Sequence, residues 1–148
     1  MVSFQTIYDQ FLRTITSCTL SQCTDEEIEA QLSDMLLTAI TQFKFPKVKL
    51  DYELNIDGEY VFNNDITQKE IVVLIKLMRK EWVSYQLTKE SNYQEGYYDA
   101  NARRHSKANL IAQLNRLFEN ISEDAEDTER EYYKVNRDGR PALGDIKW

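Results

Sequence analysis

Histidine, cysteine, glycine and proline are all scarce in this chain of 148 residues. A single histidine, His105, and two cysteines, Cys18 and Cys23, are too few for a four-ligand zinc site, so we expect neither a metal centre nor a disulfide. The glycine-rich phosphate loops, His-Glu-x-x-His and Gly-x-Ser-x-Gly are absent as well. The sequence therefore lacks the usual starting points for catalysis, and we expect a protein that is not an enzyme and needs no cofactor.

Long apolar runs are also missing. No stretch approaches the roughly 18 consecutive apolar residues that cross a bilayer. The first residues, 2–17, mix polar and apolar side chains at helical spacing and lack the basic start of a signal peptide. We therefore expect a soluble protein, made in a cytosol-like compartment, that has no membrane partner.

Basic residues are outnumbered by acidic ones. The chain has 18 Lys and Arg against 25 Asp and Glu, for a net charge of -7. Proteins that grip nucleic acid usually gather Lys and Arg on one face to displace the counterions of phosphate. Two small basic clusters exist, but acidic neighbours dilute them: Lys44, Lys47 and Lys49, and Arg103, Arg104 and Lys107. A sequence-specific nucleic-acid site is therefore not expected.

The sequence is instead rich in helical periodicity. With 42% hydrophobic residues, one domain of this length can bury a real core. Apolar side chains from Phe4 to Ile15 recur every three or four residues, which predicts a helix over about residues 3–16. Thr24 and Glu27 form a capping-box pattern, which predicts a second helix that ends near Pro46.

A change of period follows this second helix. Apolar and charged residues alternate over residues 48–54, as in a half-buried strand. Residues 55–58 supply turn formers before Tyr60, Val61 and Phe62. A short β-hairpin is therefore predicted near residues 47–62.

The second half of the chain predicts two more helices. A capping-box pattern at Thr67 and Glu70 opens the first, and Ser106 is expected to cap the second. The period breaks between them, so a loop is expected over residues 88–104. We assign four residues of the two apolar stripes to the core: Met78, Trp82, Leu114 and Phe118. The acidic residues after Ser122 are expected to continue the last helix with a solvated face towards Tyr132.

Two segments are candidates for binding a partner. The predicted loop carries Tyr93, Tyr97 and Tyr98, which either contact a partner or anchor the loop to its own body. The last residues, 134–148, show no period and form a C-terminal arm with four candidate contact residues: Pro141, Leu143, Ile146 and Trp148. The arm either docks back on the body, reaches a neighbouring copy or stays mobile, and we favour the neighbouring copy. The expected organisation is a mainly α body over residues 1–133, with about four helices and the hairpin, followed by this extended arm.

The order of residues over about 24–118 matches a pattern known from one family. Its first part is an apolar helix that ends in Phe43-Lys44-Phe45-Pro46, followed by Leu50-Asp51-Tyr52. Its second part is a threonine-capped helix with a Glu-Trp pair and a later helix opened by Ser-x-Ala: Asp65-Ile66-Thr67-Gln68-Lys69-Glu70-Ile71, Leu74, Met78, Glu81, Trp82, Asp99, Ser106, Ala108, Asn109 and Leu114. In this order the residues resemble small neck proteins of tailed bacteriophages.

That resemblance implies a function in virion assembly. It implies a head-to-tail connector, a homo-oligomeric ring under the portal protein that contacts other neck or tail proteins and lets DNA pass without specific binding. The expected location is the virion neck, after synthesis in the host cytoplasm, and the adaptor ring next to the portal is the role we favour. A stopper or tail-terminator ring is the alternative within the neck, and a cytosolic helical protein-binding adaptor or regulator is the alternative outside it.

Overall fold

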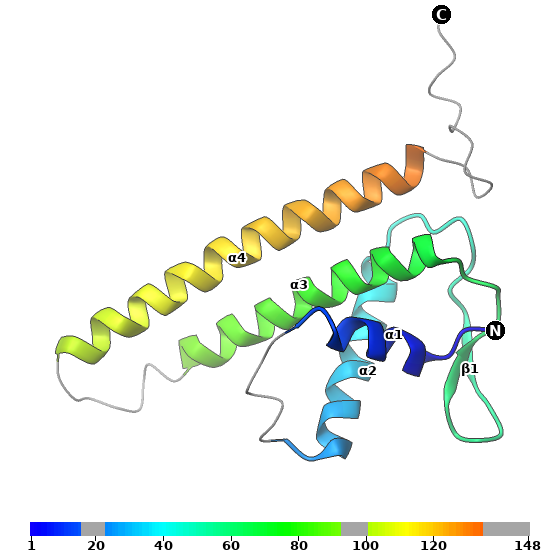
Figure 1. The fold of residues 1–148 in the computed structure, drawn as a ribbon, viewed down its shortest axis with the longest axis horizontal. Helices are drawn as coiled ribbons and strands as arrows, with labels where there is room; N and C mark the ends of the chain where they lie inside the picture. The colour runs from blue at the N-terminus through cyan, green and yellow to red at the C-terminus, as the bar shows by residue number, and fades with distance from the viewer. Residues whose placement is uncertain (16–22, 93–100, 135–148) are drawn as a thin grey trace, which may run out of the picture.

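Four helices and one β-hairpin make up the described part of the chain (Figure 1). The computed structural model describes residues 1–15, 23–92 and 101–134, with the side chains of residues 90–92 and 101–107 left aside. The elements in chain order are α1 (Phe4–Leu12), α2 (Asp25–Gln42), β1 (Tyr52–Leu54), β2 (Tyr60–Phe62), α3 (Gln68–Asn92) and α4 (Asn101–Lys134). The protein is therefore mainly helical with a small antiparallel hairpin, as the sequence predicts.

The helix α1 is shorter than its apolar stripe suggests. Ser3 caps its start by accepting a hydrogen bond from the Thr6 backbone amide. The helix ends at Leu12 rather than near Thr16, because the amide and hydroxyl of Thr14 both bond to the Phe11 carbonyl and close a turn. Its apolar face is buried against the rest of the body.

The capping box predicted for α2 is present. The Thr24 backbone amide donates to the Glu27 carboxylate at 2.9 Å, and the Glu27 amide donates to the Thr24 hydroxyl at 3.3 Å. Acidic residues in the first turn also face the positive end of the helix dipole. At the other end of α2, the Gln42 side chain donates to Glu81 of α3 at 2.6 Å, which ties the two helices together.

The hairpin is present, but its strands are shorter and more exposed than predicted. The register pairs Tyr52 with Phe62 and Leu54 with Tyr60. Val48 and Leu50 are buried before β1 begins, whereas all three residues of β1 are exposed. The alternation of apolar and charged residues over 48–54 therefore matches burial only at Val48 and Leu50. The distal part of the hairpin is exposed because no other described segment covers it.

The two long helices α3 and α4 run side by side along the length of the molecule (Figure 1). The predicted bounds of the connection, residues 88–104, are wrong, since α3 continues to Asn92 and α4 already begins at Asn101. Ser106 lies inside α4 and is not its cap. The sequence contains neither Gly nor Pro at residues 88–92 or 101–106, so nothing there stops helix growth.

The core surrounds the N-terminal half of α3. Met78 is fully buried there and Trp82 lies at the edge of the core, stacked on Tyr85 with ring centroids 6.5 Å apart. Phe118 of α4 packs on this core in part, but Leu114 is half-buried and lies outside it, contrary to the prediction. The helices α1 and α2 lie on the side of α3 away from α4, and the far end of the α3–α4 pair projects beyond them (Figure 1).

Candidate functional site

The described residues contain one buried carboxylate, that of Glu70 in the first turn of α3. Only 1% of this residue is exposed. The Thr67 backbone amide donates to Glu70 Oε2 at 2.9 Å, and the Thr67 hydroxyl donates to the same oxygen. Burial would raise the pKa of Glu70, but the hydrogen bonds from Thr67, Tyr132 and the Glu70 amide together hold it below its usual value. Glu70 is therefore an ionised, hydrogen-bonded group inside the protein.

Tyr132, near the end of α4, connects this carboxylate to the segment between α2 and β1. Its hydroxyl donates to Glu70 Oε1 at 2.9 Å and accepts from the Lys47 backbone amide at 2.8 Å. The Lys47 ammonium donates to the Tyr132 carbonyl at 2.6 Å and lies 4.5 Å from the centre of its ring. The ring also meets the Phe43 ring edge-on at 5.2 Å. One side chain thus fixes three segments of the chain to each other.

These two groups form a structural network. Burial raises the pKa of Tyr132 to about 12, with a further contribution from the neighbouring Glu70 carboxylate, although the hydrogen bond from Lys47 lowers it. A group that exchanges protons at neutral pH needs a pKa near 7. Glu70 is shifted down and Tyr132 is shifted up, so both pKa values move away from that range. The arrangement suits the fixing of α4 to the body, and we call it the Glu70–Tyr132 network.

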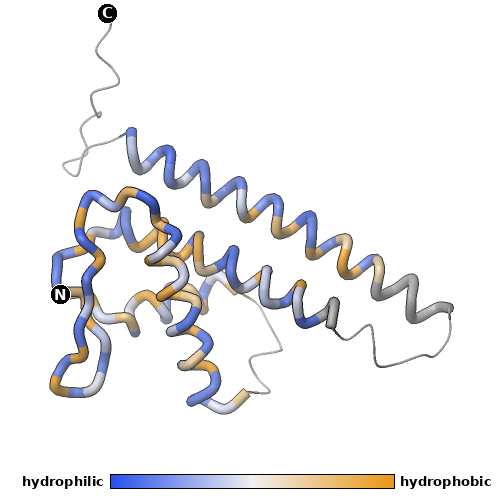
Figure 2. Tube along the Cα trace, turned by 180° about the vertical axis from the view of Figure 1, so that it is seen from behind, coloured by the Kyte–Doolittle hydropathy of each residue, from blue (hydrophilic) through white to orange (hydrophobic). Residues whose placement is uncertain are grey.

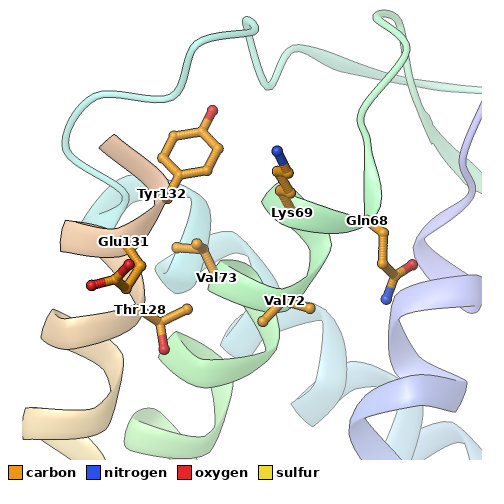
Figure 3. Close-up of a pocket in the computed structure, with 7 residues that line it drawn as sticks. All are labelled: Gln68, Lys69, Val72, Val73, Thr128, Glu131 and Tyr132. Carbon is orange, nitrogen blue, oxygen red and sulfur yellow. The ribbon is translucent and has the colours of Figure 1, made fainter. Parts of the chain in front are cut away.

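A cavity of about 330 Å³ lies between α3 and α4 beside this network (Figure 3). Its lining residues are Gln68, Lys69, Val72, Val73, Thr128, Glu131 and Tyr132. Figure 3 shows the two valines between the helices, with Lys69 on the α3 side and Glu131 on the α4 side. The cavity therefore has an apolar floor and one charge of each sign at its rim.

A second cavity of about 320 Å³ lies on the other side of Val72, between α1 and α3. It is lined by Gln10, Arg13, Thr14, Val72, Ile75 and Lys76. Val72 contributes to both cavities and is only half-buried. The strip of α3 between α1 and α4 therefore carries two adjoining hollows, each with two apolar residues among polar and charged side chains.

Large apolar side chains are also exposed in several parts of the molecule, which include Phe45 before β1, α4 and the hairpin. Leu110 and Leu117, at the projecting end of α4, are 41% and 43% exposed. In the hairpin, Leu54 is 58% exposed and Ile56 is fully exposed. The hairpin and the N-terminal end of α4 lie at opposite ends of the molecule (Figure 1). Contiguous apolar patches mark binding surfaces, whereas single exposed apolar residues are common on protein surfaces.

The helix α4 changes character along its length. Residues 101–118 contain Arg and Lys but no acidic residue, whereas residues 119–131 are dominated by acidic ones: Glu119, Glu123, Asp124, Glu126, Asp127, Glu129 and Glu131. Figure 2 shows the C-terminal half as mostly hydrophilic, with hydrophobic positions towards the other end. In the acidic half, Asp124 forms an ion pair with Lys76 of α3. The acidic half of α4 thus lies next to the cavity that Tyr132 lines.

The candidate residues predicted for partner binding are not described by the structure. Tyr93, Tyr97 and Tyr98 lie outside the described residues, and so do Pro141, Leu143, Ile146 and Trp148 of the arm. Lys134, the first residue assigned to the arm, is the last residue of α4. The role of these residues stays a prediction.

Sequence reasoning missed the central position of Tyr132 and the burial of Glu70. The sequence predicts a capping role for Glu70, and the packed structure shows that its carboxylate is buried. For Tyr132 a signal was available, since it follows Ala125 by seven residues and Phe118 by fourteen, and such spacing repeats one face of a helix. The acidic residues around Tyr132 make this apolar spacing hard to recognise in the sequence.

The described residues offer no group of three or more His, Cys, Asp or Glu side chains that could hold a metal ion. Within the same residues, no helix has the length and apolar character needed to cross a membrane. A scan against protein-family models, a search of curated proteins and a search of solved structures each found no match. The resemblance to phage neck proteins stays a prediction, and the case for a function depends on the surfaces themselves.

Proposed function

We propose that this protein is a structural subunit of the neck of a tailed bacteriophage, an adaptor ring that binds the portal and connects the head to the tail. The observation that carries the proposal is the exposure of apolar residues at two distant ends of one subunit, at Leu110 and Leu117 and at Leu54 and Ile56. A subunit with a single patch forms a two-fold dimer through that patch. Two different patches on one subunit favour head-to-tail contacts, which close into a ring.

The charge of the chain also supports this proposal. A ring that lines a DNA conduit has to let the duplex pass without holding it. A net charge of -7 repels phosphate and therefore disfavours adhesion of DNA to the wall. The same charge would weaken a protein that must bind nucleic acid to act.

The attachment of α4 to the body suits a structural part. The Glu70–Tyr132 network fixes one end of this helix to α3 and to the segment before β1. A helix of 34 residues is about 51 Å long at 1.5 Å per residue, and most of its support comes from α3. The far end therefore reaches beyond the body, where it can meet a neighbouring subunit.

The direct test is the size of the particles that the protein forms. Native mass spectrometry of the purified protein, alone and mixed with the portal protein encoded in the same genome, should detect ring-sized species. A protein that stays monomeric and does not bind the portal would contradict the proposal and favour a cytosolic adaptor or regulator. A stopper or tail-terminator ring would also form rings, but it would bind another neck or tail protein in place of the portal.

A matched pair of variants sharpens this test. Leu110→Ser with Leu117→Ser removes apolar area from the projecting end and should reduce ring formation without changing the circular dichroism spectrum. Gln113→Ser with Glu119→Ser changes two exposed polar residues of the same helix and serves as the control. Equal assembly of both double variants would show that the exposed leucines do not contribute to the interface.

A further inference from the structure

We propose that residues 135–148 of one copy dock on the strip of α3 between α1 and α4 of a neighbouring copy, with Ile146 and Trp148 in the two cavities beside Val72. This inference rests on the proposed ring and names the contact that links its subunits. It concerns a surface that the Glu70–Tyr132 network shapes, because Tyr132 itself lines the first cavity.

The two cavities have a size that suits side chains rather than a larger ligand. Their volumes of about 330 and 320 Å³ lie at the lower end of the range for small-molecule pockets. Val72 lines both cavities, so the two cavities lie next to each other. In an extended segment, residues two apart project to the same side about 6.6 Å from each other. Ile146 and Trp148 have that separation in the sequence.

The remaining part of the chain has the composition to fill these cavities. Residues 135–148 contain three large apolar residues, Leu143, Ile146 and Trp148. Tryptophan is the side chain most often found as an anchor in binding pockets. Gly139, Pro141 and Gly144 disfavour a helix for this segment, so an extended docked form is the one expected.

Charge complementarity favours the same surface. Arg137 and Arg140 precede the apolar residues of the segment. The acidic half of α4, which ends beside the first cavity, provides exposed carboxylates at Asp127 and Glu131, which also pair with Arg130 and Lys134 of the same helix. The basic residues of an arriving segment would therefore meet the acidic half of α4 while its apolar residues enter the cavities.

The length of the segment allows it to reach another subunit. Fourteen residues at about 3.3 Å each extend to about 46 Å, which approaches the length of α4. The segment leaves α4 directly after Lys134, a few residues from Thr128 and Glu131 at the cavity of its own subunit. Docking in the same subunit would close that cavity without linking copies. Docking in the next subunit gives each copy one donor segment and one acceptor surface, which is the arrangement that a ring requires.

Mixing two blocked variants tests the arrangement. Val72→Arg places a charged side chain between the cavities and should block the acceptor, whereas Trp148→Ala should weaken the donor at least thirtyfold, about the effect of losing a hot-spot residue. Each variant alone should fail to form rings at concentrations where the unchanged protein does. An equimolar mixture should give one dimer and nothing larger, because only one donor and one acceptor remain competent in each pair. Rings formed by either variant alone would overturn the proposal.

A cross-linking experiment keeps the test informative if Val72→Arg misfolds. In a Cys18→Ser, Cys23→Ser background, Lys69→Cys at the rim of the first cavity and Gly144→Cys in the segment leave Val72, Ile146 and Trp148 unchanged. In an extended segment Gly144 lies on the same side as Ile146 and Trp148, so the new cysteine projects towards the acceptor surface. Oxidation of a mixture of the two single-cysteine proteins should give a disulfide between different copies. A protein that carries both cysteines and forms only an intrachain disulfide would overturn the proposal in favour of docking within one subunit. Ala30→Cys, exposed on α2, replaces Lys69→Cys in the control mixture and should not cross-link.

The outcomes separate this inference from the proposed function. Rings that persist in both Val72→Arg and Trp148→Ala would contradict the proposed docking of residues 135–148, but they would not contradict the proposed ring. An unchanged protein that never associates, with or without the portal, would remove both.

Discussion

The two halves of α4 differ in composition, and the burial of each half is the opposite of what its composition suggests. The N-terminal half carries Leu110 and Leu117, yet both are more than two-fifths exposed. The C-terminal half is densely acidic, yet it contains the buried residues Ala125 and Tyr132. The difference arises because α1, α2 and the segment before β1 surround only one end of the α3–α4 pair (Figure 1).

This comparison separates helix formation from burial. Periodicity in the sequence predicts which side of α4 is apolar, and the face with Phe118, Ile121 and Ala125 does point to α3. It does not reveal how much of the helix length other segments cover. The leucine-rich half is free for contacts with other molecules, and the acidic half is held by a few buried groups.

The largest effect on the free energy of unfolding should come from replacing Tyr132, which attaches the C-terminal half of α4 to the body. Tyr132→Ala removes a buried ring and leaves the Glu70 carboxylate without one of its hydrogen-bond donors, so we expect unfolding to become easier by about 3–5 kcal/mol. Leu117→Ala, in the exposed half, should cost less than about 1 kcal/mol. Urea denaturation followed by circular dichroism measures both. Equal losses for the two variants would contradict the contrast between the halves.

A smaller loss should follow from removing the Tyr132 hydroxyl alone. Tyr132→Phe keeps the ring but deletes the donor to Glu70 and the acceptor for the Lys47 amide, which should cost about 1–3 kcal/mol. Combining it with Glu70→Gln tests whether the two groups act together. We expect the double variant to lose less than the sum of the single losses, since both remove the same hydrogen bond. Strict additivity in urea denaturation would show that this bond contributes nothing.

The Glu70–Tyr132 network should also make the stability of the protein depend on pH. The pKa of Glu70 is lower in the folded protein than its ordinary value of 4.5, so the folded state binds fewer protons than the unfolded state in that range. Its contribution is present above pH 4.5 and is lost as the pH falls through the folded pKa. Burial raises the pKa of Glu129, whose contribution has the opposite sign. Melting temperatures between pH 3 and 6 should therefore fall less steeply in Glu70→Gln than in Glu129→Gln. Parallel curves for the two variants would exclude this role for Glu70.

Most of the fold follows from the sequence because its signals are local. The capping box at Thr24 and Glu27, the turn at residues 55–58 and the apolar stripe of α3 each depend on residues a few positions apart. The limits of the loop were wrong because a loss of apolar period does not stop a helix when Gly and Pro are absent, and both helices continue towards it.

Much less of the candidate site follows from the sequence. The cavities beside Val72 depend on how α1 and α4 lie on α3, and the Glu70–Tyr132 hydrogen bond joins residues 62 positions apart. No local pattern encodes such a distance. The exposure of Leu110 and Leu117 could not be predicted either, because exposure depends on the absence of a covering segment rather than on the residues themselves.

The smallest effect on stability should come from removing the end of the chain. Deletion of residues 139–148 takes away Leu143, Ile146 and Trp148, which we propose bind a neighbouring copy. We therefore expect the helical circular dichroism signal and the melting temperature to stay nearly unchanged, whereas ring-sized species should disappear in native mass spectrometry. Lys147→Ala, which keeps all three apolar residues, is the full-length control and should still assemble. If the deletion unfolds the protein instead, these residues belong to the core of their own subunit. The contrast between a packed body and a separate assembly segment would then be wrong.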